Sequence, residues 1–260
     1  MKLANVCWEI VSSDEEDQAS TSTISPSHRA PPKKPPNPSN EKESLQKYFY
    51  QPFAWKLLPK NNTCGPNVTT LIVVHSANQY SLYRKAIRET YGKKKYQEMF
   101  NYRLFFAEGK SENLTKEANL REEAAQYEDI IQADFLDSYR NLTIKYLMWM
   151  RYVRDFCPDT ELVLKIDDDI LVDIFWLFEE IRIKKISKER CFTCRLNQGN
   201  VIRDTTHKWY VSKDAMPEDA WNVYSSGIAV IQGKLSFSNE HSSILLPLYG
   251  YCTSLLTYKM

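Results

Sequence analysis

The sequence predicts an α/β fold: an open, largely parallel sheet flanked by helices and preceded by a disordered N-terminal tail. From about residue 68, short runs of β-branched and apolar residues alternate with longer segments of helical periodicity. Such alternation builds strand–helix–strand units with parallel strands. Residues 12–43, by contrast, are rich in serine, proline and charge and contain almost no apolar side chains.

The tail prediction depends on entropy. Too few apolar groups lie in residues 12–43 to offset the conformational entropy lost on ordering the chain. We therefore expect residues 1–45 to be a disordered tail or linker and residues 46–260 to form one folded unit. The proline-rich run from Pro31 to Pro36 also suits an SH3-type partner, so an interaction role for the tail stays open.

The expected elements follow one another without an internal repeat. Gly92 ends the first helix, and Pro158 ends a long helix that is apolar on most of its faces. The last expected strand leads directly into three aspartates. In chain order we predict a strand at 68–74, a helix at 81–91, a strand at 102–107, a helix at 114–126, a strand at 129–132, a helix at 138–156, a strand at 161–166 and a helix at 174–186.

Composition excludes several classes of protein. The chain has 34 basic and 33 acidic residues, so it lacks the excess positive charge that nucleic-acid binding requires. Its apolar runs fall short of the roughly 18 residues of a membrane span. With 260 residues and 43% hydrophobic content, one core of ordinary size is the expectation.

Cysteines and glycosylation sequons bear on the compartment. The sequence has six cysteines, and the C-x-x-C pair at Cys191 and Cys194 is interpreted as core thiols or as one partner of a disulfide with Cys64 or Cys157. Asn-x-Ser/Thr triplets favour a secretory route. They begin at Asn61, Asn67, Asn113 and Asn141.

The strongest chemical signal is the run Asp167, Asp168 and Asp169. Ligands of open α/β sheets bind at the carboxyl ends of the strands, where this run lies. Adjacent carboxylates repel one another, and a hard divalent ion such as Mg²⁺ or Mn²⁺ that bridges to a diphosphate would neutralise them. The alternative is that they cap the following helix, for which Asp173 is a further candidate.

Several ordered motifs resemble one enzyme family. Residues 84–92, 128–145 and 165–172 are similar to the motifs R-x-x-I-R-x-T-W, E-D-I-I-x-x-D-F-x-D-S-Y-x-N-L-T-x-K and K-x-D-D-D-V-F-V of the beta-1,3-galactosyltransferase and beta-1,3-N-acetylglucosaminyltransferase family. The similarity spans about residues 68–233. It implies a GT-A-like fold, a UDP-sugar donor, a glycan or glycoconjugate acceptor, and inverting transfer of galactose or an N-acetylhexosamine to form a beta-1,3 linkage. It also implies a Mn²⁺ cofactor, with Mg²⁺ possible, and a type II Golgi membrane protein.

Carried over residue by residue, the resemblance implies a site. The expected metal ligands are Asp169 and Asp167. The expected donor-binding residues are Arg84, Arg88, Asp134, Lys145, Lys165, Asp167, Asp168, Trp209, Ser226 and Gly227.

Each of these residues also has a structural interpretation. The two arginines lie one helical turn apart and could instead form ion pairs with acidic segments. Lys145 lies in a largely apolar helix, so it needs a carboxylate or phosphate partner. Asp134 and Asp137 could instead cap that helix. Trp209 could instead be a core residue, and Gly227 could only permit a backbone turn.

The sequence departs from the family at both ends. The resemblance places the catalytic base in an E-D-V segment after the S-G motif, and residues 236–260 contain no such segment. Glu218, Asp219 and Glu240 do not match it, so the base stays unassigned. The family's amino-terminal membrane anchor is not found either. We expect either an incomplete C-terminal part or a catalytically silent nucleotide-sugar-binding protein. The isolated His75 and His207 receive no catalytic role.

Overall fold

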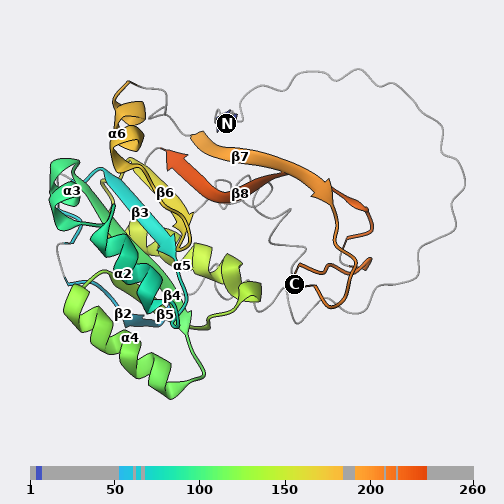
Figure 1. Ribbon diagram of the computed structural model, residues 1–260, viewed down its shortest axis with the longest axis horizontal. Coiled ribbons are helices and arrows are strands. Elements are labelled where there is room, and N and C mark those ends of the chain that lie inside the picture. The colour runs from blue at the N-terminus through green and yellow to red at the C-terminus, as the bar shows by residue number, and fades with distance from the viewer. Residues whose placement is uncertain are drawn as a thin grey trace, which may run out of the picture.

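One eight-stranded sheet with helices on both faces organises the chain (Figure 1). The computed structural model describes residues 4–7, 53–60, 63–65, 68–183, 191–207, 209–214 and 216–232. Within them the strand order is β1-β7-β8-β6-β3-β4-β5-β2. The expectation of an α/β fold with an open sheet and flanking helices is confirmed.

The parallel part of the sheet lies at its centre. Strands β3 (Thr70–His75), β4 (Tyr102–Lys110), β5 (Ile130–Leu136) and β6 (Leu162–Asp167) pair in parallel in the order β6-β3-β4-β5. All six residues of β3 are buried, as befits a strand covered on both faces. In register, His75 lies opposite Ala107 and Asp167, so β3 and β6 end level at the carboxyl edge, whereas β4 continues to Lys110.

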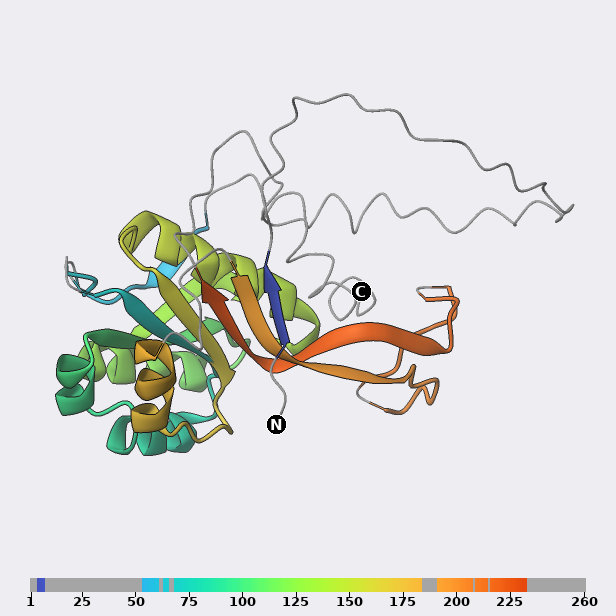
Figure 2. The same cartoon turned by 90° about the horizontal axis from the view of Figure 1, so that it is seen from above.

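Antiparallel strands flank this parallel centre. On one side β2 (Trp55–Leu57) pairs with β5. On the other, β8 (Ala220–Gln232) pairs with β6, β7 (Cys191–Asn200) with β8, and β1 (Ala4–Cys7) with β7. The hairpin of β7 and β8 extends well beyond the helical body (Figure 2). The sequence prediction did not include these two long strands.

Alternate residues of each central strand supply the two layers of the core. Leu71 and Val73 pack with α5 (Leu142–Phe156) on one face. Ile72 and Val74 face the opposite layer. That layer contains α2 (Ser81–Glu89), α3 (Lys94–Met99), α4 (Leu114–Tyr127) and α6 (Ile174–Arg182). This alternation is the period-2 geometry of a strand.

Several predicted boundaries change. The long helix begins with the 3-10 turn η1 (Tyr139–Asn141) before α5, and α3 was not predicted. The third predicted strand is longer, because β5 continues to Leu136. Residues 4–7 form β1. Residues 8–52, which include most of the expected tail, lie outside the described part of the chain, so the tail stays a prediction.

A disulfide joins Cys64, before β3, to Cys157, at the end of α5. The two cysteines are 93 residues apart, and Cys157 is 2% exposed. Because they bond to each other, the predicted alternative in which Cys191 or Cys194 pairs with one of them is wrong. A cross-link that closes a loop of this length stabilises the fold chiefly by restricting the unfolded chain.

We predict that Cys157→Ser lowers the free energy of unfolding by about 4 kcal/mol, the value expected for a loop of this length. Urea denaturation followed by tryptophan fluorescence measures the change. The matched control is Cys64→Ser, which should give the same midpoint, as should the wild-type chain in excess dithiothreitol. A wild-type midpoint insensitive to reductant would contradict the prediction.

Candidate functional site

The acidic turn at the carboxyl edge is built from the end of β6. Asp168 donates its backbone N–H to the His75 carbonyl at 3.1 Å, and Ile170 donates to the Asp167 carbonyl at 3.2 Å. The Tyr91 hydroxyl, at the position where the family motif has tryptophan, donates to the Ile170 carbonyl at 3.1 Å. Tyr91, in the motif at residues 84–92, thus holds the turn that contains the three aspartates of the motif at residues 165–172.

Helix capping does not explain the three aspartates. Asp173 is the N-cap of α6, and its Oδ1 accepts from the Trp176 N–H at 3.0 Å. The capping interpretation of the run 167–169 is therefore wrong. Asp173 alone caps the helix, so capping does not account for Asp167, Asp168 and Asp169.

The three aspartates have different surroundings. The Asp167 side chain is 42% exposed, and its Oδ1 lies 2.6 Å from the Lys165 ammonium. Asp169 is exposed. Asp168 is half-buried, and its Oδ2 has no hydrogen-bond partner among the described residues. Burial raises the pKa of Asp168, a hydrogen bond from Ser76 opposes the rise, and the charge of Asp169 adds to it.

This donor set fits a hard divalent ion. An unpartnered carboxylate oxygen beside two further carboxylates gains from a nearby cation. No group of three His, Cys, Asp or Glu side chains converges within the described segments. Proteins commonly hold Mg²⁺ through one or two carboxylates, while substrate phosphates and waters complete the shell.

Lys145 has the carboxylate partner that its position requires. It is 2% exposed, and its ammonium lies 2.8 Å from Asp137 Oδ1 and donates to the Ser76 carbonyl at 2.5 Å. Asp137 Oδ2 accepts from the Gly109 N–H at 2.7 Å. A Cβ at Gly109 would lie 2.8 Å from the Phe135 carbonyl oxygen, so only glycine permits this approach.

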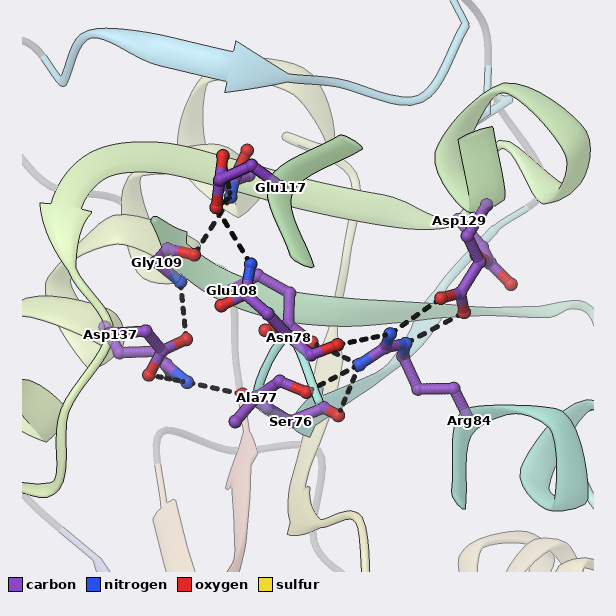
Figure 3. Close-up of polar contacts among 12 residues, drawn as sticks. Ser76, Ala77, Asn78, Arg84, Glu108, Gly109, Glu117, Asp129 and Asp137 are labelled. Carbon is purple, nitrogen blue, oxygen red and sulfur yellow. Dashed lines mark hydrogen bonds and ion pairs between the residues drawn. The ribbon is translucent and has the colours of Figure 1, made fainter. Parts of the chain in front are cut away.

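Arg84 is the centre of a buried ion cluster (Figure 3). Its side chain is 0% exposed and lies 2.9 Å from Glu108 Oε1 and 2.6 Å from Glu123 Oε2. It also donates to the Ser76 hydroxyl at 3.1 Å and to the Ala77 carbonyl at 2.8 Å. A side chain surrounded in this way has no surface to offer a ligand, so the ion-pair interpretation of Arg84 holds.

Arg88 extends the same cluster. It forms ion pairs of 2.7 Å with Asp129 and with Glu123, and its guanidinium lies over the rings of Phe106 and Tyr127. Both arginines therefore bind α2 to α4 and to the sheet. Sequence spacing placed them on one helix face but did not show that acidic groups lie opposite.

Sequence reasoning missed Glu108 and Ser76. Glu108 is fully buried on β4, and its Oε2 has no partner among the described residues. Burial raises its pKa, and the charges of Lys145 and Arg84 oppose that rise. A glutamate inside the apolar run Phe105–Ala107 and Gly109 was a signal that a buried cation must lie nearby. Ser76 carried no such signal, because a serine after a strand is common.

Asp134 and Trp209 lie at different parts of the edge. Asp134 belongs to β5 rather than to a turn and pairs with Lys110 at 2.7 Å, so it does not cap α5. Trp209 is 44% exposed and hydrogen-bonds with Tyr139. Burial raises the pKa of Tyr139, the Trp209 contact opposes this, and the charge of Asp167 raises it further. Trp209 and Tyr139 are thus in contact, and Tyr139 lies within range of the Asp167 charge.

The last two predicted residues lie in β8. Ser226 and Gly227 belong to the strand, so the backbone-turn interpretation of Gly227 is wrong. The β7–β8 register shifts between the pairs Cys194–Ala229 and Leu196–Ser225, which places both residues at a bulge. Lys208, in the neighbouring motif, lies outside the described residues.

Fold and site together define an α/β protein with an acidic turn at the carboxyl end of a parallel strand, where open α/β sheets bind ligands. Residues 83–235 match the family model described as Galactosyltransferase. The chain therefore belongs to the galactosyltransferase family.

Curated relatives agree with this assignment. The chain is 33% identical to Beta-1,3-galactosyltransferase 1 of Homo sapiens over 177 residues, which cover 67% of this chain and 54% of the relative. It is 34% identical to Beta-1,3-galactosyltransferase 5 of Homo sapiens over 196 residues, covering 72% and 63%. The chain thus spans about half the length of the first of these relatives.

We predict that Arg84→Leu lowers the free energy of unfolding by about 3–5 kcal/mol, because it removes the close ion-pair partner of the fully buried Glu108 and one of the two arginines that pair with Glu123. The neighbouring Lys85→Leu is the matched control. Lys85 is 63% exposed and lies 3.8 Å from Glu89, so its loss should cost under about 1 kcal/mol. Urea denaturation of both variants measures the difference, and equal effects would refute the structural role of Arg84.

Proposed function

We propose that this chain binds a UDP-sugar at the acidic turn and transfers its hexose to a glycan or glycoconjugate hydroxyl with inversion, forming a beta-1,3 linkage. The hexose is galactose or an N-acetylhexosamine. The observation that carries the proposal is the run Asp167 to Asp169, which helix capping does not use and which includes an unpartnered buried oxygen. Membership of the galactosyltransferase family supports it.

Asp169 and Asp167 would hold the divalent ion, Mn²⁺ or Mg²⁺. When bound, the ion stabilises the negative charge that develops on the departing diphosphate. Lys165, 2.6 Å from Asp167, fixes the orientation of that carboxylate and offsets the repulsion within the run. The acidic turn is therefore arranged before any ligand arrives.

Aromatic side chains suit the sugar. Trp209 and Tyr139 contact each other beside Asp167, and each is a little under half exposed. Such rings offer an apolar face to a sugar ring and a polar group at its edge. The remaining proposed donor contacts are Asp134, Lys145, Lys165, Asp168, Ser226 and Gly227. In this proposal Arg84 and Arg88 do not contact the donor; their ion pairs hold in place the elements that carry the site.

A second candidate function is nucleotide-sugar binding without transfer. Inverting transfer needs a carboxylate base for the acceptor proton. Lys213 and Arg203 hold the pKa of Asp219 below its usual range, which makes this carboxylate a weak base. Glu240 lies outside the described residues. Product formation from a radiolabelled UDP-sugar by the purified chain distinguishes the two functions.

The compartment we propose is the Golgi, with attachment to the membrane. The disulfide between Cys64 and Cys157 supports passage through an oxidising compartment, because cytosolic thiols are kept reduced. None of the described helices has the length and apolar character needed to cross a membrane.

We predict that UDP binding requires Mn²⁺ and that Asp169→Ala abolishes it. Isothermal titration calorimetry of UDP with and without Mn²⁺ measures both effects. Asp173→Asn is the matched control, because asparagine keeps the α6 cap and changes a carboxylate outside the proposed metal set. Its affinity should equal that of the wild type. An unchanged affinity in Asp169→Ala would defeat the metal assignment.

A further inference from the structure

We propose that Asn113 is a site of N-linked glycosylation. It begins the triplet Asn113, Leu114 and Thr115, between the end of β4 and the start of α4. All three residues are exposed, and Leu114 is 84% exposed. A glycosylating enzyme can therefore reach both the asparagine amide and the threonine hydroxyl that it reads.

The side chain of Asn113 can serve the fold and carry a sugar together. Its Oδ1 accepts from the Lys116 N–H at 3.1 Å and so caps α4. The sugar attaches to the other atom, Nδ2. A bond forms between Nδ2 and C1 of a lipid-diphosphate-linked oligosaccharide, the C1–O bond breaks, the lipid diphosphate leaves, and the amide loses one proton. The capping oxygen takes no part.

The other described triplet has a different geometry. Asn141 Nδ2 donates to the Leu136 carbonyl at 2.8 Å, and Thr143 is 4% exposed. In the folded chain the reacting nitrogen there is engaged and the hydroxyl is buried. Among the triplets whose side chains are described, Asn113 is therefore the one that keeps both the amide nitrogen and the hydroxyl accessible in the folded chain.

The disulfide gives independent support. Glycosylation of asparagine takes place in the lumen of the secretory route, where disulfides also form. The bond between Cys64 and Cys157 closes within this same folded unit. A chain that acquires this disulfide during folding is exposed to the glycosylating enzyme at the same stage.

The test expresses the full chain in the secretory route of a eukaryotic cell and maps glycopeptides by mass spectrometry before and after N-glycosidase treatment. Wild type and Thr115→Ser should carry glycan at Asn113, and Thr115→Ala should lose it. Asn113→Asp should lose it too while keeping the α4 cap, since aspartate caps as well as asparagine.

Formation of the disulfide, seen as a mass difference on reduction, shows that each variant has folded. An Asn113 peptide without glycan in the disulfide-bonded wild-type chain would overturn the proposal. Retention of the glycan in Thr115→Ala would overturn it as well.

A different observation carries a second inference, which rests on the proposed function: we infer that Ser76 positions Asp168. Ser76 follows β3 and is 4% exposed. Its carbonyl accepts from Lys145, and its hydroxyl accepts from Arg84 Nη1 at 3.1 Å. The hydroxyl is also within hydrogen-bonding reach of two carboxylates, Asp168 and Glu108, and the Asp168 backbone N–H donates to the carbonyl of His75, the residue before Ser76.

The direction of these bonds follows from donor counting. A serine hydroxyl has one proton, and a guanidinium can only donate. Arg84 therefore occupies a lone pair of the hydroxyl, and the proton is directed to a carboxylate. When that carboxylate is Asp168, one of its oxygens is held and Oδ2 is left without a partner. The buried cluster thus orients a residue of the acidic turn without touching the ligand.

We predict that Ser76→Ala weakens Mn²⁺-dependent UDP binding about tenfold, the effect of one lost hydrogen bond to a charged group. Ser76→Cys, which keeps the volume but is a weak donor, should show the same direction of change. Ser81→Ala, at the exposed start of α2, is the control and should bind as the wild type does. Calorimetry at several Mn²⁺ concentrations gives the affinities, and thermal melting shows that each variant is folded.

The outcomes are distinguishable. Absence of Mn²⁺-dependent UDP binding in the wild type would overturn the proposed function and this inference with it. Wild-type binding that folded Ser76→Ala and Ser76→Cys both retain would overturn the inference alone. A folded Ser76→Cys with weakened affinity supports it even where the alanine variant does not fold.

Discussion

The buried guanidinium of Arg84 is the interaction on which the arrangement of the site depends. It is 0% exposed and contacts two carboxylates from different elements, Glu108 on β4 and Glu123 on α4. A buried charge without a partner costs several kcal/mol. Moving α2, β4 or α4 away from the other two would leave such a charge, so the three elements stay together. The same side chain donates to Ser76 and Ala77, and this fixes the chain where it leaves β3.

The polar contacts continue from Ser76 to the carboxyl edge of the sheet. Ser76 connects Arg84 to Asp168 through its hydroxyl and to Lys145 through its carbonyl. Lys145 in turn holds Asp137, which receives the Gly109 N–H. Three motifs that are far apart in sequence therefore meet at one edge. Ser76, which lies in none of the three motifs, contacts a residue of each: Arg84, Lys145 and Asp168.

The sequence predicted the central strands and helices well because burial on both faces leaves a strong apolar signal, as in β3 and α5. It did not predict β7 and β8, whose residues mix polar and apolar types. It grouped Arg84 and Arg88 correctly on one face of α2 but left donor binding and ion pairing open as alternatives. Spacing shows which side chains share a face, whereas Glu108, Glu123 and Asp129 become their neighbours only through the fold. The need of Lys145 for a carboxylate followed from burial alone, and Asp137 could be identified only in three dimensions.

The acidic turn differs from the rest of the polar network in one respect. Arg84, Arg88 and Lys145 are each matched with carboxylates, as buried charges must be. In the run Asp167 to Asp169, the described contacts supply one close ammonium, from Lys165, for three adjacent carboxylates. Burial and mutual repulsion raise the pKa of Asp168, so the turn costs stability in the absence of a cation. A bound divalent cation would remove this imbalance, and this is the physical argument for the metal site that we propose at the acidic turn.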